Sequence, residues 1–139
     1  MTAKEFLQDI RSKRRLLESM QQRADELRVM AEGVGAIRYD KDRVQVSPMD
    51  HMSETTAALI ELEEQIGRMI VEYNKAIILR VRMIEKLNDP RYIQLLTLRY
   101  IDCLRFEEIS CRMSYSWQHI LRLHGEALTA FARQYSGQF

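Results

Sequence analysis

The sequence predicts an all-α protein with two long helices followed by three short ones, and three observations lead to this fold class. Only 5 of the 139 residues are Gly and 2 are Pro, which is too little turn punctuation for a β-sandwich, a barrel or a doubly wound α/β fold. Apolar residues recur at helical spacing over most of the chain. Hydrophobic residues make up 46% of the chain and charged residues 29%, so it can bury a core, in one domain or in two small modules.

The first long helix is predicted from residue 2 to about residue 31. Thr2 and Glu5 have the spacing of a capping box, in which each side chain bonds the backbone amide of the other. Nine of ten positions spaced alternately by three and four residues are apolar, which is a heptad seam and indicates coiled-coil packing. The seam positions are Ala3, Phe6, Ile10, Lys13, Leu17, Met20, Ala24, Leu27, Ala31 and Val34. Gly33 and Gly35 are expected to end the helix.

Residues 33–52 are expected to connect the two long helices, because Gly, a charged cluster and Pro48 interrupt the pattern. Val44 and Val46 alternate with polar residues, so a short extended piece is possible there. The second long helix is predicted from about Ser53 to Leu87, with apolar residues on two sides.

The heptad seam can be used in two ways. An antiparallel hairpin between the two long helices of one chain would bury it, and so would a second copy of the chain. Because the seam is clean and the second helix is apolar on two sides, a homodimer or higher homo-oligomer is the favoured expectation. Its interface would contain Phe6, Ile10, Leu17, Met20 and Leu27.

Three short helices are predicted after Asn88. Asp89 is a good N-cap and Pro90 suits the first helical position, so the first of them should run from Pro90 to about Ile101. The second should run from about Phe106 to Met113 and the third from about Ser116 to Tyr135. The last two, joined by Ser114 and Tyr115, have the length and apolar spacing of a helix-turn-helix. The chain is thus expected to divide into a long-helix oligomerisation region, 1–88, and a helix-turn-helix domain, 89–139.

A helix-turn-helix that binds DNA places the first turns of its second helix in the major groove. Ile120, Leu123, Ala127 and Leu128 recur at helical spacing and should face the core. The opposite face is then predicted to carry Trp117, Gln118, His119, Leu121, Arg122 and His124, with Ser116 as N-cap. Gln and Arg pair with adenine and guanine edges, and Trp or Leu can contact a thymine methyl group. Arg99, Arg105 and Arg112 are candidates to contact the DNA phosphates.

The net charge of +1 gives no bulk attraction to nucleic acid. Any DNA binding must therefore come from a local face. Within 90–139 six Arg stand against four acidic residues, a modest excess that predicts weak binding by a single copy.

The segment DPRYIQLLTLRYIDCLRFEEISCRMSYSWQHILRLHGEAL, Asp89–Leu128, resembles DNA-binding region four of bacterial sigma factors. It is more similar still to small transcriptional regulators of phages and prophages of the ArpU and RinA late-activator type. Their shared arrangement is DPRY, LRY, FEEI, YS, LH and AL behind a long helical part, and YDKDRVQVSP, Tyr39–Pro48, is similar to a linker in those relatives. The family commonly has Gly where this chain has Cys103 and Ser114. Its recognition helix usually starts with two basic residues, where this chain has Trp117, Gln118 and His119.

The resemblance implies a sequence-specific DNA-binding regulator of phage or prophage genes, acting on a late operon. Its implied partners are double-stranded DNA and host RNA polymerase. Two alternatives stay open: a phage small terminase subunit that recognises packaging DNA, and a sigma-like module that binds polymerase without reading DNA.

No enzyme, cofactor, small-molecule substrate or metal site is expected. The common nucleotide, zinc-protease and redox signatures are absent, and Glu107 and Glu108 have no accompanying nucleophile. The spacing of Cys103, Cys111, His119 and His124 matches no common zinc site, and Cys111 is expected to face the core. No apolar run approaches the roughly 18 residues of a membrane span, and no signal peptide is visible. Two cysteines then fit free thiols in a reducing cytoplasm, here that of a bacterial host.

Overall fold

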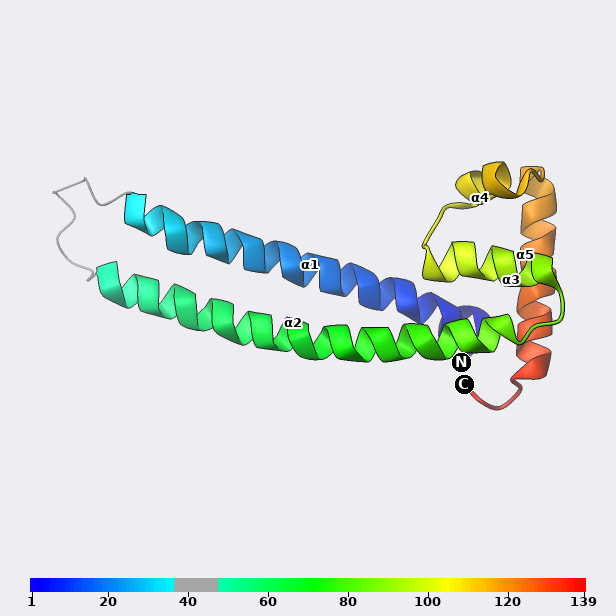
Figure 1. Cartoon of the computed structure of the whole chain (residues 1–139), viewed down its shortest axis with the longest axis horizontal. Helices are drawn as coiled ribbons and strands as arrows, with labels where there is room; N and C mark the ends of the chain where they lie inside the picture. The colour runs from blue at the N-terminus through cyan, green and yellow to red at the C-terminus, as the bar shows by residue number, and fades with distance from the viewer. Residues whose placement is uncertain (37–47) are drawn as a thin grey trace. The chain divides into compact units, whose positions relative to one another are not determined.

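A computed structural model describes the backbone of residues 1–36 and 48–139 and the side chains of residues 1–32 and 54–139. Every element in these ranges is helical, which confirms the all-α prediction (Figure 1). The elements are α1 (Ala3–Ala36), α2 (Pro48–Glu85), α3 (Pro90–Leu96), the π-helix η1 (Thr97–Ile101), α4 (Phe106–Met113) and α5 (Trp117–Gln134).

The chain divides into two compact units. Unit 1 contains residues 1–14 and 73–139, and unit 2 contains residues 15–72. The first turns of α1 and the last turns of α2 belong to unit 1 because they pack into the same core as the C-terminal helices.

Short-range signals placed several helix ends correctly. The Glu5 amide donates to Thr2 Oγ1 at 3.2 Å and the Thr2 nitrogen donates to Glu5 Oε2 at 2.7 Å, so the capping box is confirmed. Asp89 caps α3 by accepting from the Arg91 amide at 2.9 Å, with Pro90 as the first helical residue. The bounds of α4 match the expectation, and those of α5 differ by one residue at each end.

The long helices extend further toward each other along the chain than expected. Helix α1 passes through Gly33 and Gly35 to Ala36, and α2 begins at Pro48. A helix tolerates a glycine at a cost of about 1 kcal/mol, and proline fits the first helical position, so neither residue enforces the predicted end. The extended piece expected at Val44 and Val46 lies outside the described residues.

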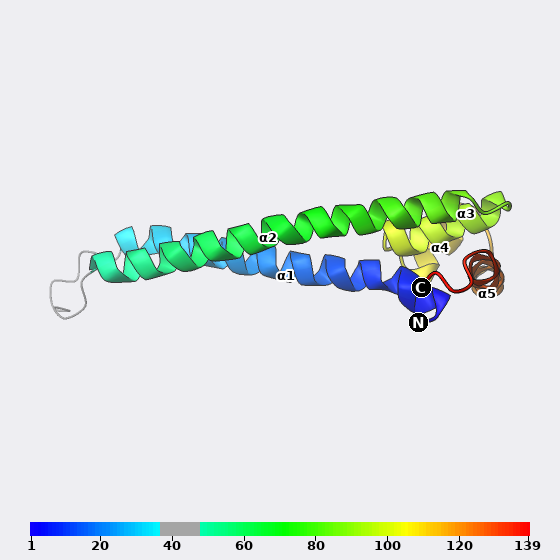
Figure 2. The ribbon, with the colours of Figure 1, turned by 90° about the horizontal axis from the view of Figure 1, so that it is seen from below.

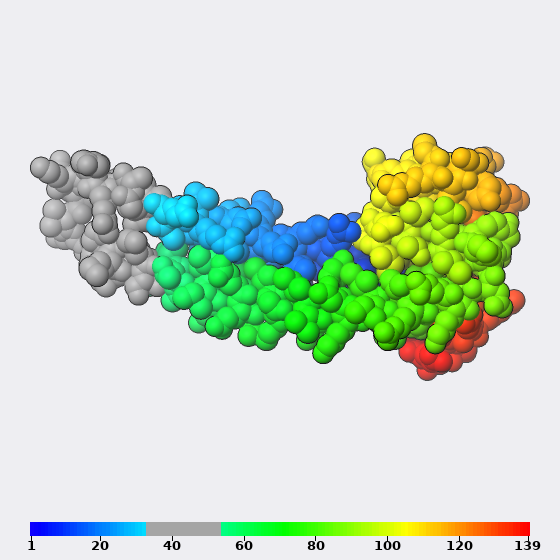
Figure 3. Space-filling view, in the orientation of Figure 1, coloured from blue at the N-terminus to red at the C-terminus, as the bar shows by residue number. Residues whose placement is uncertain are grey.

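Unit 2 is an antiparallel pair of helical segments, one from α1 and one from α2, which lie side by side in both ribbon views (Figures 1 and 2). Leu17, Ala24 and Ile66 are its buried hydrophobic side chains in the described ranges. Arg28 links the two helices through an ion pair with Glu63 at 2.8 Å. In the space-filling view the atoms of the two segments meet along the pair (Figure 3). The heptad seam is therefore closed within one chain, in the hairpin arrangement.

Unit 1 holds two adjoining hydrophobic clusters. The first joins the start of α1, the end of α2, the α3–η1 segment and the C-terminal half of α5, with Leu7, Ile84, Leu96 and Phe131 fully buried. The second lies among α3, η1, α4 and the N-terminal half of α5. It consists of Leu95, Leu98, Ile109, Ile120 and Leu123. Because both clusters include α5, this helix is held along its whole length.

The segment predicted as one helix, 90–101, is broken in the structure. Helix α3 ends at Leu96 and the π-helix η1 follows, in which the Asp102 amide donates to the Thr97 carbonyl at 3.0 Å. Cys103 then has φ 58°, in the left-handed region. The wider π-helical turn and the left-handed conformation of Cys103 together redirect the chain into α4.

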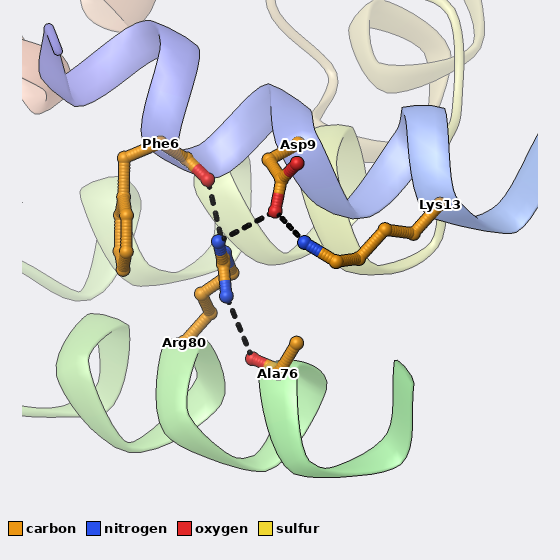
Figure 4. A network of polar contacts seen from close by, with 5 residues as sticks. All are labelled: Phe6, Asp9, Lys13, Ala76 and Arg80. Carbon is orange, nitrogen blue, oxygen red and sulfur yellow. Dashed lines mark hydrogen bonds and ion pairs between the residues drawn. The ribbon is translucent and has the colours of Figure 1, made fainter. Parts of the chain in front are cut away.

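A buried arginine joins the start of α1 to α2 within unit 1 (Figure 4). Arg80 is 5% exposed and donates to the Phe6 carbonyl at 2.9 Å, to the Ala76 carbonyl at 3.2 Å and to Asp9 Oδ2 at 3.1 Å. Its guanidinium also lies 4.1 Å from the centre of the Phe6 ring, and Lys13 pairs with Asp9. Burial lowers the Arg80 pKa, an effect that Asp9 opposes.

Within the described residues, none of the helices combines the length and apolarity that a membrane crossing requires.

Candidate functional site

The candidate site is built on the turn between α4 and α5. Ser114 ends α4 with φ 57° and ψ 37°, the left-handed conformation that glycine adopts most easily. The Tyr115 amide donates to the Ser110 carbonyl at 3.2 Å. Ser116 Oγ accepts from the His119 amide at 3.1 Å, which confirms Ser116 as the N-cap of α5. The turn therefore fixes where α5 begins and in which direction it leaves.

The inward side of α5 is anchored in the cores. Ile120, Leu123, Ala127 and Phe131 are 0–1% exposed. Leu128, which we also placed toward the core, packs against the first cluster as a partly buried residue. With this side fixed, the opposite side of the first two turns must face outward.

The outward side of those two turns carries Trp117, Gln118, Leu121 and Arg122. Trp117 is 51% exposed and Leu121 is 37% exposed, so neither belongs to a core. The side chains of Gln118 and Arg122 are exposed and make no hydrogen bond or ion pair with the described part of the chain. We call these four residues the α5 face. It offers one cation, one amide and two apolar groups.

His119 lies at the edge of the α5 face. Its ring is half-buried and packs at a tilt against the ring of Tyr115, with the ring centres 4.4 Å apart. Tyr115 in turn packs against the second cluster, which contains Ile109 and Ile120.

The prediction that His124 lies on the α5 face is wrong. His124 is 9% exposed, and its Nε2 lies 2.8 Å from the hydroxyl of Tyr100. Burial lowers the His124 pKa to about 4, aided by Arg99, and burial raises the Tyr100 pKa to about 12. His124 is therefore a neutral core residue near pH 7. Its spacing could have shown this, because it follows Ile120 by four residues and precedes Ala127 by three.

The three arginines proposed to contact phosphates differ in their surroundings. Arg99 is half-buried, donates to the Leu104 carbonyl at 2.9 Å and lies 4.1 Å from the centre of the Phe106 ring, so it holds the turn before α4. Arg105 is exposed and paired with Glu108 at 3.0 Å. Arg112 is exposed at the end of α4 and has no partner in the described part of the chain. Arg112 is thus the one most available to a ligand.

The seam residues expected at an oligomer interface are largely covered by their own chain. Ile10 is 0% exposed and Leu17 is 8% exposed. Phe6 stacks on Phe131 and Phe139 within unit 1. Met20 and Leu27 are half-buried in unit 2. The expected interface at Phe6, Ile10 and Leu17 is therefore corrected to intrachain packing.

Cys103 and Cys111 are free thiols in the structure. Cys111 is exposed, contrary to the expectation that it faces the core, because it lies two residues after the buried Ile109 and so on another side of α4. No group of three or more His, Cys, Asp or Glu side chains in the described ranges could hold a metal ion.

Two shallow depressions flank α5 on the side of α3, and Tyr92, Ala130 and Arg133 line both. Arg122 and Glu126 line the one nearer the α5 face, where the Tyr92 hydroxyl lies 3.4 Å from Glu126.

Comparison of the chain with protein-family models, curated proteins and solved structures finds no match.

Proposed function

We propose that the protein is a sequence-specific DNA-binding regulator in which α4, the Ser114 turn and α5 form a helix-turn-helix. The observation that carries the proposal is the α5 face. It stands on the first two turns of a helix whose other side is locked into two cores. In a helix-turn-helix those two turns enter the major groove.

The chemistry of the α5 face suits base edges. Arg122 can pair with guanine, Gln118 with adenine, and Trp117 or Leu121 with a thymine methyl group. None of these side chains is committed to the core. Arg112, at the end of α4, would contact the phosphate backbone. His124 and Arg99 are not part of the proposed site, because each is hydrogen-bonded to another residue of its own chain.

The resemblance to late activators of phages and prophages supports a role in their transcription. Host RNA polymerase is the partner that this role implies. The homo-oligomer stays a prediction. Ile10 and Leu17 are buried in their own chain, so they could form its interface only if the two long helices separated.

The test begins with selection of bound fragments from the genome that encodes the protein. With the recovered site, Arg122→Ala should cost about 1–3 kcal/mol of specific binding and relax one base position. Arg112→Ala should weaken all sequences alike and reduce the salt dependence.

Arg133→Ala is the matched control, since Arg133 is exposed on the same helix roughly 16 Å further along at 1.5 Å per residue. It should leave specific binding unchanged. Equal effects of Arg122→Ala and Arg133→Ala would reject the assignment of the α5 face.

The large exposed area of Trp117 favours one rival, a protein-binding module of the sigma type. In that case no DNA fragment would be enriched over a random pool. Trp117→Ala would then abolish co-purification with polymerase while the fold stays intact.

A further inference from the structure

The side of α2 that is turned away from its buried residues carries several exposed hydrophobic side chains. Helix α2 is continuous from Pro48 to Glu85, so helical periodicity alone places residues on its sides. Four of the ten large hydrophobic side chains that are exposed in the described ranges lie on this side. They are Ile60, Val71, Ile78 and Leu79, each 50–53% exposed.

Helical geometry sets these four residues opposite the core. At about 100° per residue, all four fall within about 60° of Lys75. The buried Ile66 and Ile84 are each nine residues from Lys75, which is half a turn around the helix. We call the exposed residues of 57–82 that lie within about 60° of Lys75 the outer face of α2.

The N-terminal half of the outer face is acidic. Residues 55–67 include no Lys, Arg or His, and Glu61 and Glu64 both lie on this face. Neither carboxylate makes an ion pair or a hydrogen bond with the described part of the chain. This half therefore presents negative charge beside the exposed Ile60.

The C-terminal half of the outer face is basic. Residues 73–84 include no Asp or Glu, and Lys75 and Arg82 both lie on this face. Neither side chain has an ion pair among the described residues. Glu85, the next acid along the chain, lies about 80° around the helix from Lys75 and so outside the face. This half therefore presents positive charge beside two exposed hydrophobic residues.

We propose that the outer face of α2 packs antiparallel against the outer face of α2 in a second copy of the chain. In an antiparallel pair with its twofold axis near residue 70, positions whose numbers add up to about 140 lie opposite each other. Glu64 then lies opposite Lys75 of the second copy, and Arg68 lies opposite its Glu72. The twofold axis makes each of these ion pairs form twice.

The same register covers the exposed hydrophobic side chains. Ile60 lies opposite Ile78 and Leu79 of the second copy. Val71 lies beside the twofold axis, where it meets its own counterpart. A second copy fits this face because the axis brings the basic half of one chain onto the acidic half of the other. A parallel pair would set acid against acid and base against base.

This interface leaves the packing of the buried Ile66 and Ile84 unchanged, because it uses the opposite side of α2. It would form the homo-oligomer predicted from the sequence without using the heptad seam. It does not depend on DNA binding, so the two proposals can fail separately.

The test exchanges charges in the full-length chain and measures association by sedimentation equilibrium. The wild type should be a dimer at tens of micromolar. Glu64→Lys sets two cations opposite each other, and Lys75→Glu sets two acids opposite each other. Each variant alone should therefore dimerise about tenfold more weakly or worse. An equimolar mixture of the two variants should dimerise as the wild type does, because each variant supplies the charge that the other lacks.

Lys4→Glu is the matched control, since it makes the same change at an exposed residue of α1. It should leave the dimer unchanged. All three replaced residues are exposed in the single chain, so helical circular dichroism should stay at the wild-type level. A monomeric wild type, association in a number other than two, or a mixture that associates no better than its components overturns the proposal. So does equal weakening by Lys4→Glu and Lys75→Glu.

Discussion

The two units of the chain bury their hydrophobic residues in different ways. Unit 2 uses one seam between two helices, and three hydrophobic side chains are buried there in the described ranges. Unit 1 collects short segments from both ends of the chain around α5. Phe6, near the N-terminus, stacks on Phe139 at the C-terminus with the ring centres 5.2 Å apart.

This difference shows how strictly each unit determines which surfaces pack together. A regular seam accepts any helix with a matching stripe, which is why the sequence leaves both a hairpin and a dimer open. The core of unit 1 contains large side chains of many shapes, such as Tyr100 and Phe131, which fit one arrangement. We therefore expect unit 1 to be the more sensitive unit to change.

The largest effect should come from equal truncations in the two units. Leu96→Ala removes a fully buried side chain of unit 1, and should cost about 2–5 kcal/mol of unfolding free energy. Leu62→Ala removes a half-buried side chain of unit 2, and should cost about 1 kcal/mol. Urea unfolding followed by circular dichroism measures both. Equal costs would mean that the packing of the two units does not differ in this way.

Acid should destabilise unit 1 through His124. Its folded pKa of about 4 lies below the unfolded value of 6.5, so the unfolded chain binds the extra proton between these values. The stability contribution is complete above pH 6.5 and is lost as the pH falls to 4, by about 3 kcal/mol in total. Unfolding free energies across this range measure the loss.

His124→Gln should flatten that part of the pH profile, because glutamine does not titrate. An unchanged slope in this variant would show that another group causes the acid sensitivity.

One arginine in each unit makes polar contacts within that unit, and the effects of replacing the two arginines can be compared. Arg80 is buried in unit 1 with three acceptors, and Arg80→Met should cost about 2 kcal/mol because Asp9 and two carbonyls lose their donor. Arg28 is exposed in unit 2, so solvent screens its ion pair and Arg28→Met should lower stability much less than Arg80→Met. Thermal unfolding at low and high salt separates the two. A larger loss for Arg28→Met would contradict the expected ranking.

The smallest effect concerns one substitution with opposite signs in the two units. Ser114→Gly should raise the melting temperature, because glycine adopts the left-handed conformation without the strain of about 1 kcal/mol that serine has there. Ser19→Gly, in the middle of α1, should lower stability by about 0.5 kcal/mol. Calorimetry would show a stabilised and a destabilised variant.

Ser116→Ala is a second check on the same turn. Loss of the cap on α5 should cost about 1 kcal/mol. If Ser114→Gly proved less stable than the wild type, the strain assigned to Ser114 would be wrong.

Several features could be predicted from the sequence because they depend on residues a few positions apart. The capping box of Thr2 and Glu5, the caps at Asp89 and Ser116 and the bounds of α4 are of this kind. The exposed residues of the α5 face also follow from helical spacing, once Ile120 and Leu123 are placed in the core.

Other features escaped prediction because they join distant segments. No local pattern shows that Arg80 binds the Phe6 carbonyl, 74 residues away. The break between α3 and η1 falls inside a continuous apolar pattern, and no residue type near Cys103 signals its positive φ.

By itself the sequence determined that the chain is helical, where most helices begin, and which side of each one is apolar. These properties follow from hydrogen bonds and side-chain periodicity within a few turns. The tertiary structure alone decided which apolar sides meet. It closed the heptad seam within one chain, buried His124 against Tyr100 and drew both ends of the chain into unit 1. An apolar stripe in the sequence shows that one side of a helix must be buried. Only the packed structure shows which other residues bury it.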